Sequence, residues 1–266
     1  MELTSEKILS LQDLTMNFNG NFVLRGIDLD VYRGQIIGYI GPNGAGKSTT
    51  LKIMLGLVDG YGGNVEIFGE DIKKSDHAYK RKIGYVPENA EIYENLSAAE
   101  YLSFMGELYG MDREAAENKA ERLMAEFNME DVLHTRISSF SKGMRQKVII
   151  ISSLLHDPDL IFLDEPLSGL DANSVMVIKD ILEKLVKQGK TIFYSSHIMD
   201  VVEKISSRIV LLKDGRIAAD GTFEELRKAN EKGSLEDIFN QLTGFDEHKN
   251  TAERFVSIIS EGDSHA

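Results

Sequence analysis

A short glycine-rich stretch contains the residue types that bind phosphate groups. Residues 41–49 read GPNGAGKST, fit the pattern G-x-x-x-x-G-K-[ST], and lie between an apolar segment and a helical run over residues 51–57. Glycines let backbone N–H groups converge on phosphate oxygens, and the start of a helix adds a partial positive charge. We expect Lys47 to reach the β- and γ-phosphates of a nucleotide and Ser48 to offer its hydroxyl to Mg²⁺. The other candidate contacts to the nucleotide are Asn43, Gly44, Ala45, Gly46 and Thr49.

Two carboxylates follow an apolar segment in the second half of the chain. Residues 160–163 read LIFL, which is typical of a buried strand, and Asp164 and Glu165 come directly after them. Such a strand would deliver Asp164 to a metal ion at the carboxyl edge of a parallel sheet, with Glu165 beside it to polarise an attacking water. Taken alone, two acids after a strand are more often a helix cap or a solvated end. Because a phosphate-binding loop precedes them, they are candidates for a catalytic site.

The order of the predicted elements indicates an α/β fold with a mostly parallel sheet. The strands expected in the first third of the chain are residues 8–16, 22–31, 34–40 and 65–68. Farther on, apolar strands at residues 160–163 and 191–194 flank a crossover helix over residues 175–185. A hairpin is expected around residues 214–215, and a capping box predicts a short terminal helix from residue 234.

Residues 95–131 have a helical pattern and lie in an acidic part of the chain. Apolar residues at positions 116, 120, 123 and 127 recur with the spacing of one helix face. Between residues 88 and 140 there are 12 Asp or Glu and 4 Lys or Arg, a balance of −8. A solvated helical face accounts for most of these charges. The alternative is a docking surface for basic residues of a partner, which high ionic strength would weaken.

Composition excludes several classes of function. The 266 residues include 43 acidic and 30 basic side chains, a net charge of −13, which argues against binding nucleic acid or anionic lipid through bulk charge. The lack of cysteine excludes a disulfide framework, a thiolate metal site and cysteine catalysis. No signal peptide is visible, and the longest apolar runs are far short of a membrane span. We therefore expect a soluble intracellular protein that binds no nucleic acid.

Further motifs, taken in their order along the chain, resemble those of the ATP-binding cassette (ABC) family, the nucleotide-hydrolysing subunits of ABC transporters. Residues 84–88 (GYVPE) stand at the place of the family's Q-loop, and residues 140–144 (FSKGM) stand where the family has its signature LSGGQ. Residues 168–171 (SGLD) match the D-loop, and His197 matches the switch histidine. The resemblance runs from about residue 8 to residue 244.

The resemblance implies a P-loop NTPase fold, with an N-terminal antiparallel β-subdomain and an inserted helical subdomain. A single ABC ATPase domain would span residues 1–245, and we expect the tail over residues 246–266 to be flexible. Within that domain, the nucleotide-binding core with its β-subdomain would take residues 1–88 and 146–220. The helical subdomain with the signature would take residues 89–145, and C-terminal helices would take residues 221–245.

The resemblance also assigns roles, with ATP and Mg²⁺ as ligands. Phe18 would stack on adenine, and His197 would sense the γ-phosphate. Ser141 and Gly143, at a helix start, would close over the γ-phosphate held by a second ATPase subunit in a head-to-tail dimer, formed with an identical chain or a paralogue. A separate membrane-spanning subunit would carry the substrate, so we expect the protein in the cytoplasm, on the inner face of the cell membrane.

Two motifs depart from the family's pattern. Glu88 stands where the family usually has Gln, and the signature has Lys142 and Met144 in place of Gly and Gln. A carboxylate beside a triphosphate is repulsive unless a cation lies between them, so we expect Glu88 to act through Mg²⁺. Lys142 could place a cation near the γ-phosphate or direct its side chain to solvent, and the sequence leaves both possibilities open. In these variant motifs the chain resembles bacterial exporter ATPases for drugs, bacteriocins and other peptides, so family analogy favours export.

Other functions fit the sequence less well. An importer ATPase subunit would need the same motifs and stays an alternative. ABC ATPases of DNA repair need a long coiled-coil or DNA-binding insertion, for which 266 residues leave no space, and translation-factor ABC proteins carry two cassettes. A GTPase switch would need an N-K-x-D guanine-reading motif, which the sequence lacks. The sequence thus favours an ATPase subunit that energises transport, with an unidentified substrate.

Overall fold

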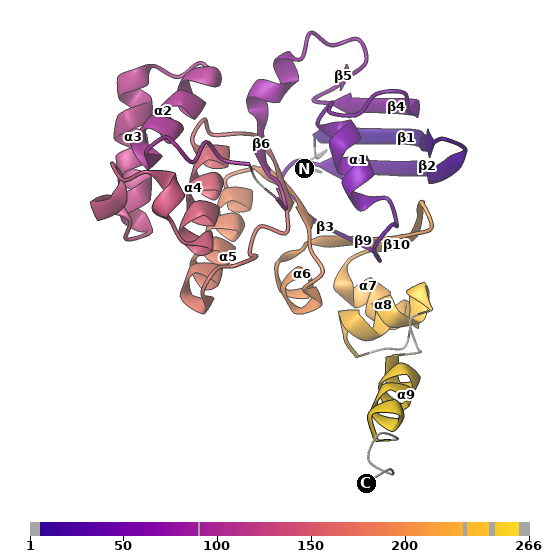
Figure 1. The fold of residues 1–266 in the computed structure, drawn as a ribbon. Helices are drawn as coiled ribbons and strands as arrows, with labels where there is room; N and C mark the ends of the chain where they lie inside the picture. Colours follow the sequence, from indigo (N-terminus) through magenta and orange to yellow (C-terminus); the bar gives the residue numbers. More distant parts are fainter. Residues whose placement is uncertain (1–5, 90, 231–232, 245–247, 261–266) are drawn as a thin grey trace.

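The described residues form two β-sheets of different kinds, which lie side by side in the molecule (Figure 1). The computed structural model describes residues 6–89, 91–230, 233–244 and 248–260. The first sheet is antiparallel, with the order β2-β1-β4-β5. Its strands are β1 (Lys7–Phe18), β2 (Asn21–Tyr32), β4 (Gly62–Ile67) and β5 (Glu70–Asp71). This sheet is the antiparallel β-subdomain that the family resemblance implied.

The second sheet is mostly parallel and has the order β10-β9-β3-β8-β7-β6. Its strands are β3 (Ile36–Ile40), β6 (Ile83–Val86), β7 (Leu160–Asp164), β8 (Thr191–Ser195), β9 (Arg208–Lys213) and β10 (Arg216–Gly221). Only the pairing of β10 with β9 is antiparallel, and it forms the hairpin expected around residues 214–215. Every residue of β3, β7 and β8 is buried, as their continuous apolar sequences predict.

Both faces of the parallel sheet are covered, one by the first sheet together with a helix and the other by helices. On one face, Tyr39 and Phe162 pack with the antiparallel sheet and with α1 (Lys47–Met54). On the other face, Ile40 and Ile161 pack with α5 (Ala172–Lys187) and α6 (Met199–Ile205). Neighbouring residues of one strand thus belong to different cores, because successive side chains point to opposite faces of a sheet. The predicted α/β fold is confirmed.

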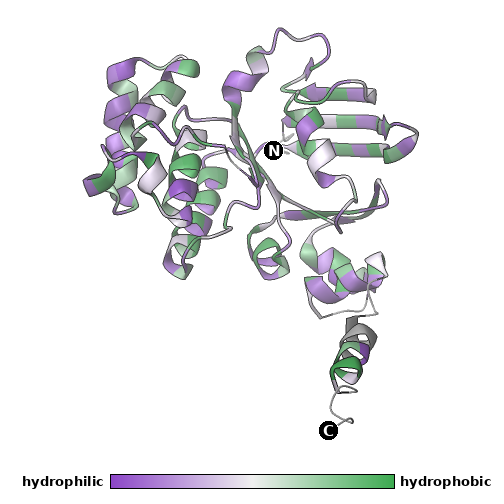
Figure 2. Cartoon of the chain, in the orientation of Figure 1, coloured by the Kyte–Doolittle hydropathy of each residue, from purple (hydrophilic) through white to green (hydrophobic). Residues whose placement is uncertain are grey.

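The helical subdomain has an apolar core of its own. That core is formed by α2 (Ala98–Leu108), α3 (Arg113–Glu126) and one side of α4 (Lys142–Leu154), including Val148 and Ile151. Ser97 and Glu100 form a capping box at the start of α2, and Asp112 caps α3. Figure 2 shows hydrophobic and hydrophilic residues side by side around α2 and α3, and the hydrophobic ones include the buried Ala120 and Met124. Single 3₁₀ turns lie at Ala78–Lys82, Glu130–Val132 and Ile137–Ser139.

The C-terminal part of the chain continues the helical structure. Helix α8 (Leu235–Thr243) packs against both α6 and α7 (Phe223–Asn230), and Ser234 caps α8 as the sequence predicts. Helix α9 (His248–Ser260) extends away from the sheets (Figure 1). It lies within the segment expected to be a flexible tail, so that segment has regular structure over these residues. Within the described residues, none of the helices has the length and apolar character needed to cross a membrane.

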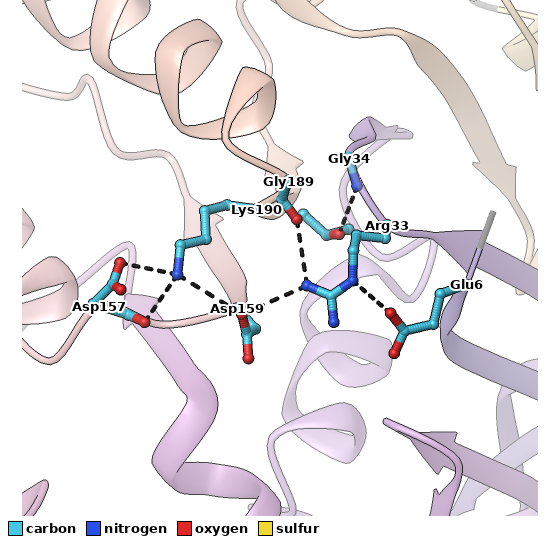
Figure 3. Close-up of polar contacts among 8 residues, drawn as sticks. Glu6, Arg33, Gly34, Asp157, Asp159, Gly189 and Lys190 are labelled. Atoms are coloured by element: carbon cyan, nitrogen blue, oxygen red, sulfur yellow. Dashed lines mark hydrogen bonds and ion pairs between the residues drawn. The ribbon is translucent and has the colours of Figure 1, made fainter. Parts of the chain in front are cut away.

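Ion pairs join the loops at the amino ends of the parallel strands (Figure 3). Arg33, just before β3, contacts Glu6 at 2.7 Å and Asp159, just before β7, at 3.5 Å. Lys190, just before β8, contacts Asp157 at 2.9 Å and the same Asp159 at 3.7 Å. These contacts fix the amino ends of three neighbouring strands. The loops at the carboxyl ends, where ligands bind in open α/β sheets, carry the residues with candidate chemistry.

Candidate functional site

The phosphate-binding loop joins the carboxyl end of β3 to the first residue of α1. The sequence predicts a helix over residues 51–57, but α1 begins at Lys47 and ends at Met54. The prediction is therefore wrong by about one turn at its start. As a result, Lys47 and Ser48 lie in the first turn of α1, where backbone N–H groups have no acceptor within the helix. Asn43, Gly44 and Ser48 are exposed, so the loop is open to an anion.

Gly46 fixes the position of the loop against the antiparallel sheet. It has a φ of 107°, which L side chains rarely adopt, and it is the N-cap residue of α1. A Cβ atom at this position would lie 2.5 Å from Leu24 Cδ2 and 3.1 Å from the Val23 carbonyl oxygen, both in β2. Behind the loop, Thr50 Oγ1 donates to the Gly46 carbonyl oxygen at 2.9 Å and accepts from the buried Tyr39 hydroxyl at 3.2 Å. Thr50 and Tyr39 thus hold the phosphate-binding loop from behind, and the sequence motif did not indicate this role.

Lys47 is directed toward the carbonyl oxygens of its own loop. Its ammonium group donates to Gly41 at 2.5 Å and to Pro42 at 3.2 Å. Burial lowers the pKa of Lys47, and the carboxylates of Glu165 and Asp164 oppose that shift. A phosphate group could take the place of the two carbonyl oxygens, and it would add the negative charge that favours the protonated amine.

Asp164 lies at the end of β7, in a buried position with other charges close by. Burial raises the pKa of Asp164, and a hydrogen bond with Ser195 opposes that shift. The carboxylates of Glu88 and Glu165 raise the pKa of Asp164 further, and the charge of Lys47 lowers it. Asp164 is therefore exposed to the negative charge of two other carboxylates and, among the described residues, to the positive charge of Lys47.

The donor set at this edge fits a hard divalent cation. Ser48 and Asp164 offer oxygen atoms, and Glu88 follows β6 on an exposed loop at the same edge. Oxygen ligands are those that Mg²⁺ prefers, and it binds through one or two carboxylates together with substrate phosphates. The mutual repulsion of the carboxylates would decrease when such an ion binds.

Glu165 accepts hydrogen bonds from two consecutive residues after β8. Its Oε1 accepts from the backbone N–H of His197 at 2.7 Å and lies 2.7 Å from His197 Nδ1. Its Oε2 accepts from Ser196 Oγ at 3.0 Å. The Glu165 side chain is 14% exposed, but that of His197 is 79% exposed. The structure therefore brings together the candidate base and the candidate sensor, with the imidazole reaching into solvent.

Ser196 is a residue of the site that sequence reasoning did not single out. We expect Ser196→Ala to lower kcat for ATP hydrolysis about tenfold, because one hydrogen bond to a charged carboxylate is lost. The KM for ATP should change little, since Ser196 lies behind Glu165 and not in the phosphate loop. Steady-state ATPase assays check this, with Ser196→Thr, which keeps the hydroxyl, as the control. A wild-type kcat for Ser196→Ala would remove the positioning role.

The other residues that are predicted to contact a nucleotide lie on separate elements. Phe18 ends β1 at a hairpin whose second strand contacts Gly46, and it is 45% exposed, which leaves its ring accessible. Ser141 is the N-cap of α4, and its side chain accepts from Met144 N–H. Ser141 and Gly143 line a hollow of about 500 Å³, and its walls, among the described residues, include none of the phosphate loop. Within one chain, these two residues thus face a site other than that of Lys47.

Known proteins are similar to this chain in sequence and in fold. The profile of the family described as ABC transporter matches residues 24–168. The chain is 34% identical over 238 residues to the ABC-type transporter ATP-binding protein EcsA of Bacillus subtilis (strain 168), covering 89% of this chain and 96% of that protein. It is 33% identical to the daunorubicin/doxorubicin resistance ATP-binding protein DrrA of Streptomyces peucetius, covering 86% of this chain and 69% of that one.

Solved structures agree with these relatives. A structure described as the ATP-binding subunit of an ABC transporter has a TM-score of 0.83 and 33% identity, covering 89% of this chain and 99% of that one. A dimeric ATP-binding cassette in a post-hydrolysis state, bound to ADP and phosphate, has a TM-score of 0.74 and 25% identity, covering 81% of this chain and 98% of that one.

Proposed function

This chain belongs to the ATP-binding cassette family of ABC transporter ATPases, which hydrolyse ATP, and from that premise we propose that it energises export of a drug, peptide or lipid-like substrate through a separate membrane protein. The observation that best supports the ATP-hydrolysing role of this chain is the grouping of Lys47, Asp164, Glu165 and His197 at the carboxyl edge of the parallel sheet. Positioning and charge stabilisation are what phosphoryl transfer requires of a protein.

The reaction is the transfer of the γ-phosphoryl group of ATP to water. Glu165 orients the water and takes its proton, as the oxygen of water bonds to phosphorus and the bond to the ADP oxygen breaks. Lys47 and the N–H groups of the loop hold the phosphates in line. His197 turns its exposed imidazole toward the γ-phosphate, while its backbone N–H keeps the carboxylate of Glu165 in place.

A bound Mg²⁺ would supply positive charge that offsets the charge on the phosphates. Ser48 and Asp164 are the residues that would hold it, with Glu88 acting on it directly or through its water shell. The exposed position of Glu88 on the loop after β6 suits a residue that links the nucleotide to a partner.

Two cassettes act together in this proposal. Ser141 and Gly143 bind the γ-phosphate held by a second ATPase subunit, and the start of α4 contributes its N–H groups and partial positive charge. The separation of these residues from the phosphate loop of their own chain supports this arrangement. So does the dimeric state of the related cassette with ADP and phosphate. Phe18 stacks on the adenine ring of the nucleotide in its own chain.

Export is favoured over import by the relatives and by the variant motifs. DrrA is described as a drug-resistance ATP-binding protein, and resistance to a compound is a natural result of its export. The signature of this chain has Lys142 and Met144, as in the exporter-like variants. An importer ATPase subunit is the alternative, and the two differ in the direction in which the membrane partner carries its substrate.

The membrane partner places the protein at the cytoplasmic face of the membrane. We expect a multi-span membrane protein to co-purify with this chain, and high ionic strength to weaken the complex if acidic residues of the helical subdomain face basic residues of the partner. The measurement is affinity purification from detergent-solubilised membranes, at low and high salt. Recovery of the chain with no membrane-spanning protein at either salt concentration contradicts the proposal. A complex that resists salt leaves the transporter function in place but requires an apolar contact.

A further inference from the structure

The first two turns of α4 hold the turn that follows Glu165. Lys142 Nζ donates to Ser168 Oγ at 3.1 Å. One turn farther along the helix, Gln146 Nε2 donates to the carbonyl oxygen of Pro166 at 2.9 Å in a buried position. Both acceptors lie within three residues of Glu165 in the sequence, so the turn after the carboxylate is attached to the helix that begins with the signature.

The contact between Lys142 and this turn is close along the side chain as well as at its end. Gly169 has a φ of +78°, and a Cβ atom at this position would lie 2.8 Å from Lys142 Cδ and 3.0 Å from Lys142 Cγ and Cε. A Cβ atom at Gly143 would lie 3.0 Å from the carbonyl oxygen of Gly169. The hydrocarbon part of Lys142 therefore lies along a glycine turn. Lys142 is exposed, as one of the two orientations left open by the sequence has it, and its side chain contacts this turn as well.

Ser168 connects Lys142 to the backbone of Glu165. Its hydroxyl accepts from Lys142, and its backbone N–H donates to the carbonyl oxygen of Glu165 at 3.2 Å. Glu165 has a φ of 50°, a region that residues other than glycine rarely occupy. Such a conformation persists only where surrounding contacts fix it. Here those contacts come from Ser168 on one side and from Ser195, whose carbonyl oxygen accepts from Glu165 N–H at 2.9 Å, on the other.

We propose that Lys142 is a positioning residue that acts through Ser168 to fix the backbone of Glu165. It thereby links the signature end of α4 to the catalytic carboxylate of the same chain. The inference rests on the proposed function, in which Ser141 and Gly143 bind the nucleotide of the second cassette. Binding of the second cassette's nucleotide at the start of α4 would then affect the position of Glu165 through Lys142 and Ser168. Glu165 in turn acts on the nucleotide held by its own chain.

A double-mutant cycle in the full chain tests the link between the two side chains. We expect Lys142→Met and Ser168→Ala each to lower kcat for ATP hydrolysis about three- to tenfold, the loss expected for one hydrogen bond, with the KM for ATP unchanged. The double variant should be no worse than either single variant, because both remove the same bond. Lys142→Arg, which can still donate to Ser168, should retain most of the activity. Lys187→Met, at an exposed lysine of α5, is the matched control.

Additive losses in the double variant, or wild-type kcat in both single variants, overturn the inference. So does a rise in the KM for ATP with Lys142→Met that Ser168→Ala does not reproduce, since that result places the ammonium group on a phosphate. Thermal unfolding of each variant separates a loss of folding from a loss of positioning. The proposed function fails separately, and only if the unmodified chain lacks ATPase activity or has no membrane partner.

Discussion

Glu165→Gln is expected to lower ATP turnover by about 10²- to 10⁴-fold, the usual contribution of a positioned general base. The substitution keeps the size and shape of the side chain, so the loss is chemical. One amide oxygen can still accept from His197 N–H, as Oε1 of the carboxylate does at 2.7 Å. The amide NH₂ would face Ser196 Oγ, which lies 3.0 Å from Oε2 and can rotate to accept a hydrogen bond. Turnover is measured by phosphate release at saturating ATP.

The same variant should bind ATP as the unmodified chain does and accumulate as an ATP-bound dimer. Removing one negative charge from the group around Asp164 reduces repulsion toward the triphosphate, and slow hydrolysis keeps the dimer closed. Size-exclusion chromatography with and without ATP measures this. Glu183→Gln, which changes an exposed carboxylate of α5, is the control. Near-normal turnover in Glu165→Gln would remove this residue from the role of the base.

The parts of the site that the sequence predicted depend on short motifs within regular elements. The phosphate loop, Asp164 and Glu165 all follow buried apolar strands, and parallel strands place their carboxyl ends at one edge of a sheet. The register confirms this for the second half of the site, because Asp164 lies opposite Ser195 in neighbouring strands. The proximity of β7 and the loop after β8 follows from the parallel arrangement of the two strands.

The parts that the sequence did not predict depend on packing between distant segments. The hydrogen bond from Ser196 to Glu165 joins residues 31 positions apart, and that from Lys142 to Ser168 joins residues 26 positions apart. Both require the exact placement of one element on another, which periodicity does not specify. The start of α1 was misplaced for a local reason. Gly46 adopts a left-handed conformation as the N-cap, so the helix begins within the motif itself and not after it.

Lys47→Ala is expected to abolish measurable ATP hydrolysis and to raise the Kd for ATP about 10- to 100-fold, the loss expected when a charged hydrogen-bond donor is removed from the phosphates. The fold should survive, because the ammonium group contacts carbonyl oxygens of the partly buried Gly41 and Pro42, and Gly46 is held independently by Thr50. Binding is measured with a fluorescent ATP analogue and hydrolysis by phosphate release. Lys52→Ala, at an exposed lysine on the same helix, is the matched control.

Lys47→Arg separates the charge of this residue from its geometry. The guanidinium group is always protonated, so it keeps a cation beside Asp164 and the carboxylates of Glu88 and Glu165 that act on it. It is planar and larger than an ammonium group, and the space available is set by the carbonyl oxygens of Gly41 and Pro42 at 2.5 Å and 3.2 Å from Lys47 Nζ. We therefore expect Lys47→Arg to bind ATP more tightly than Lys47→Ala but to hydrolyse it much more slowly than the unmodified chain. Unchanged ATP affinity in Lys47→Ala would contradict the assignment of this loop to the phosphates, because loss of a cation beside a triphosphate should weaken its binding.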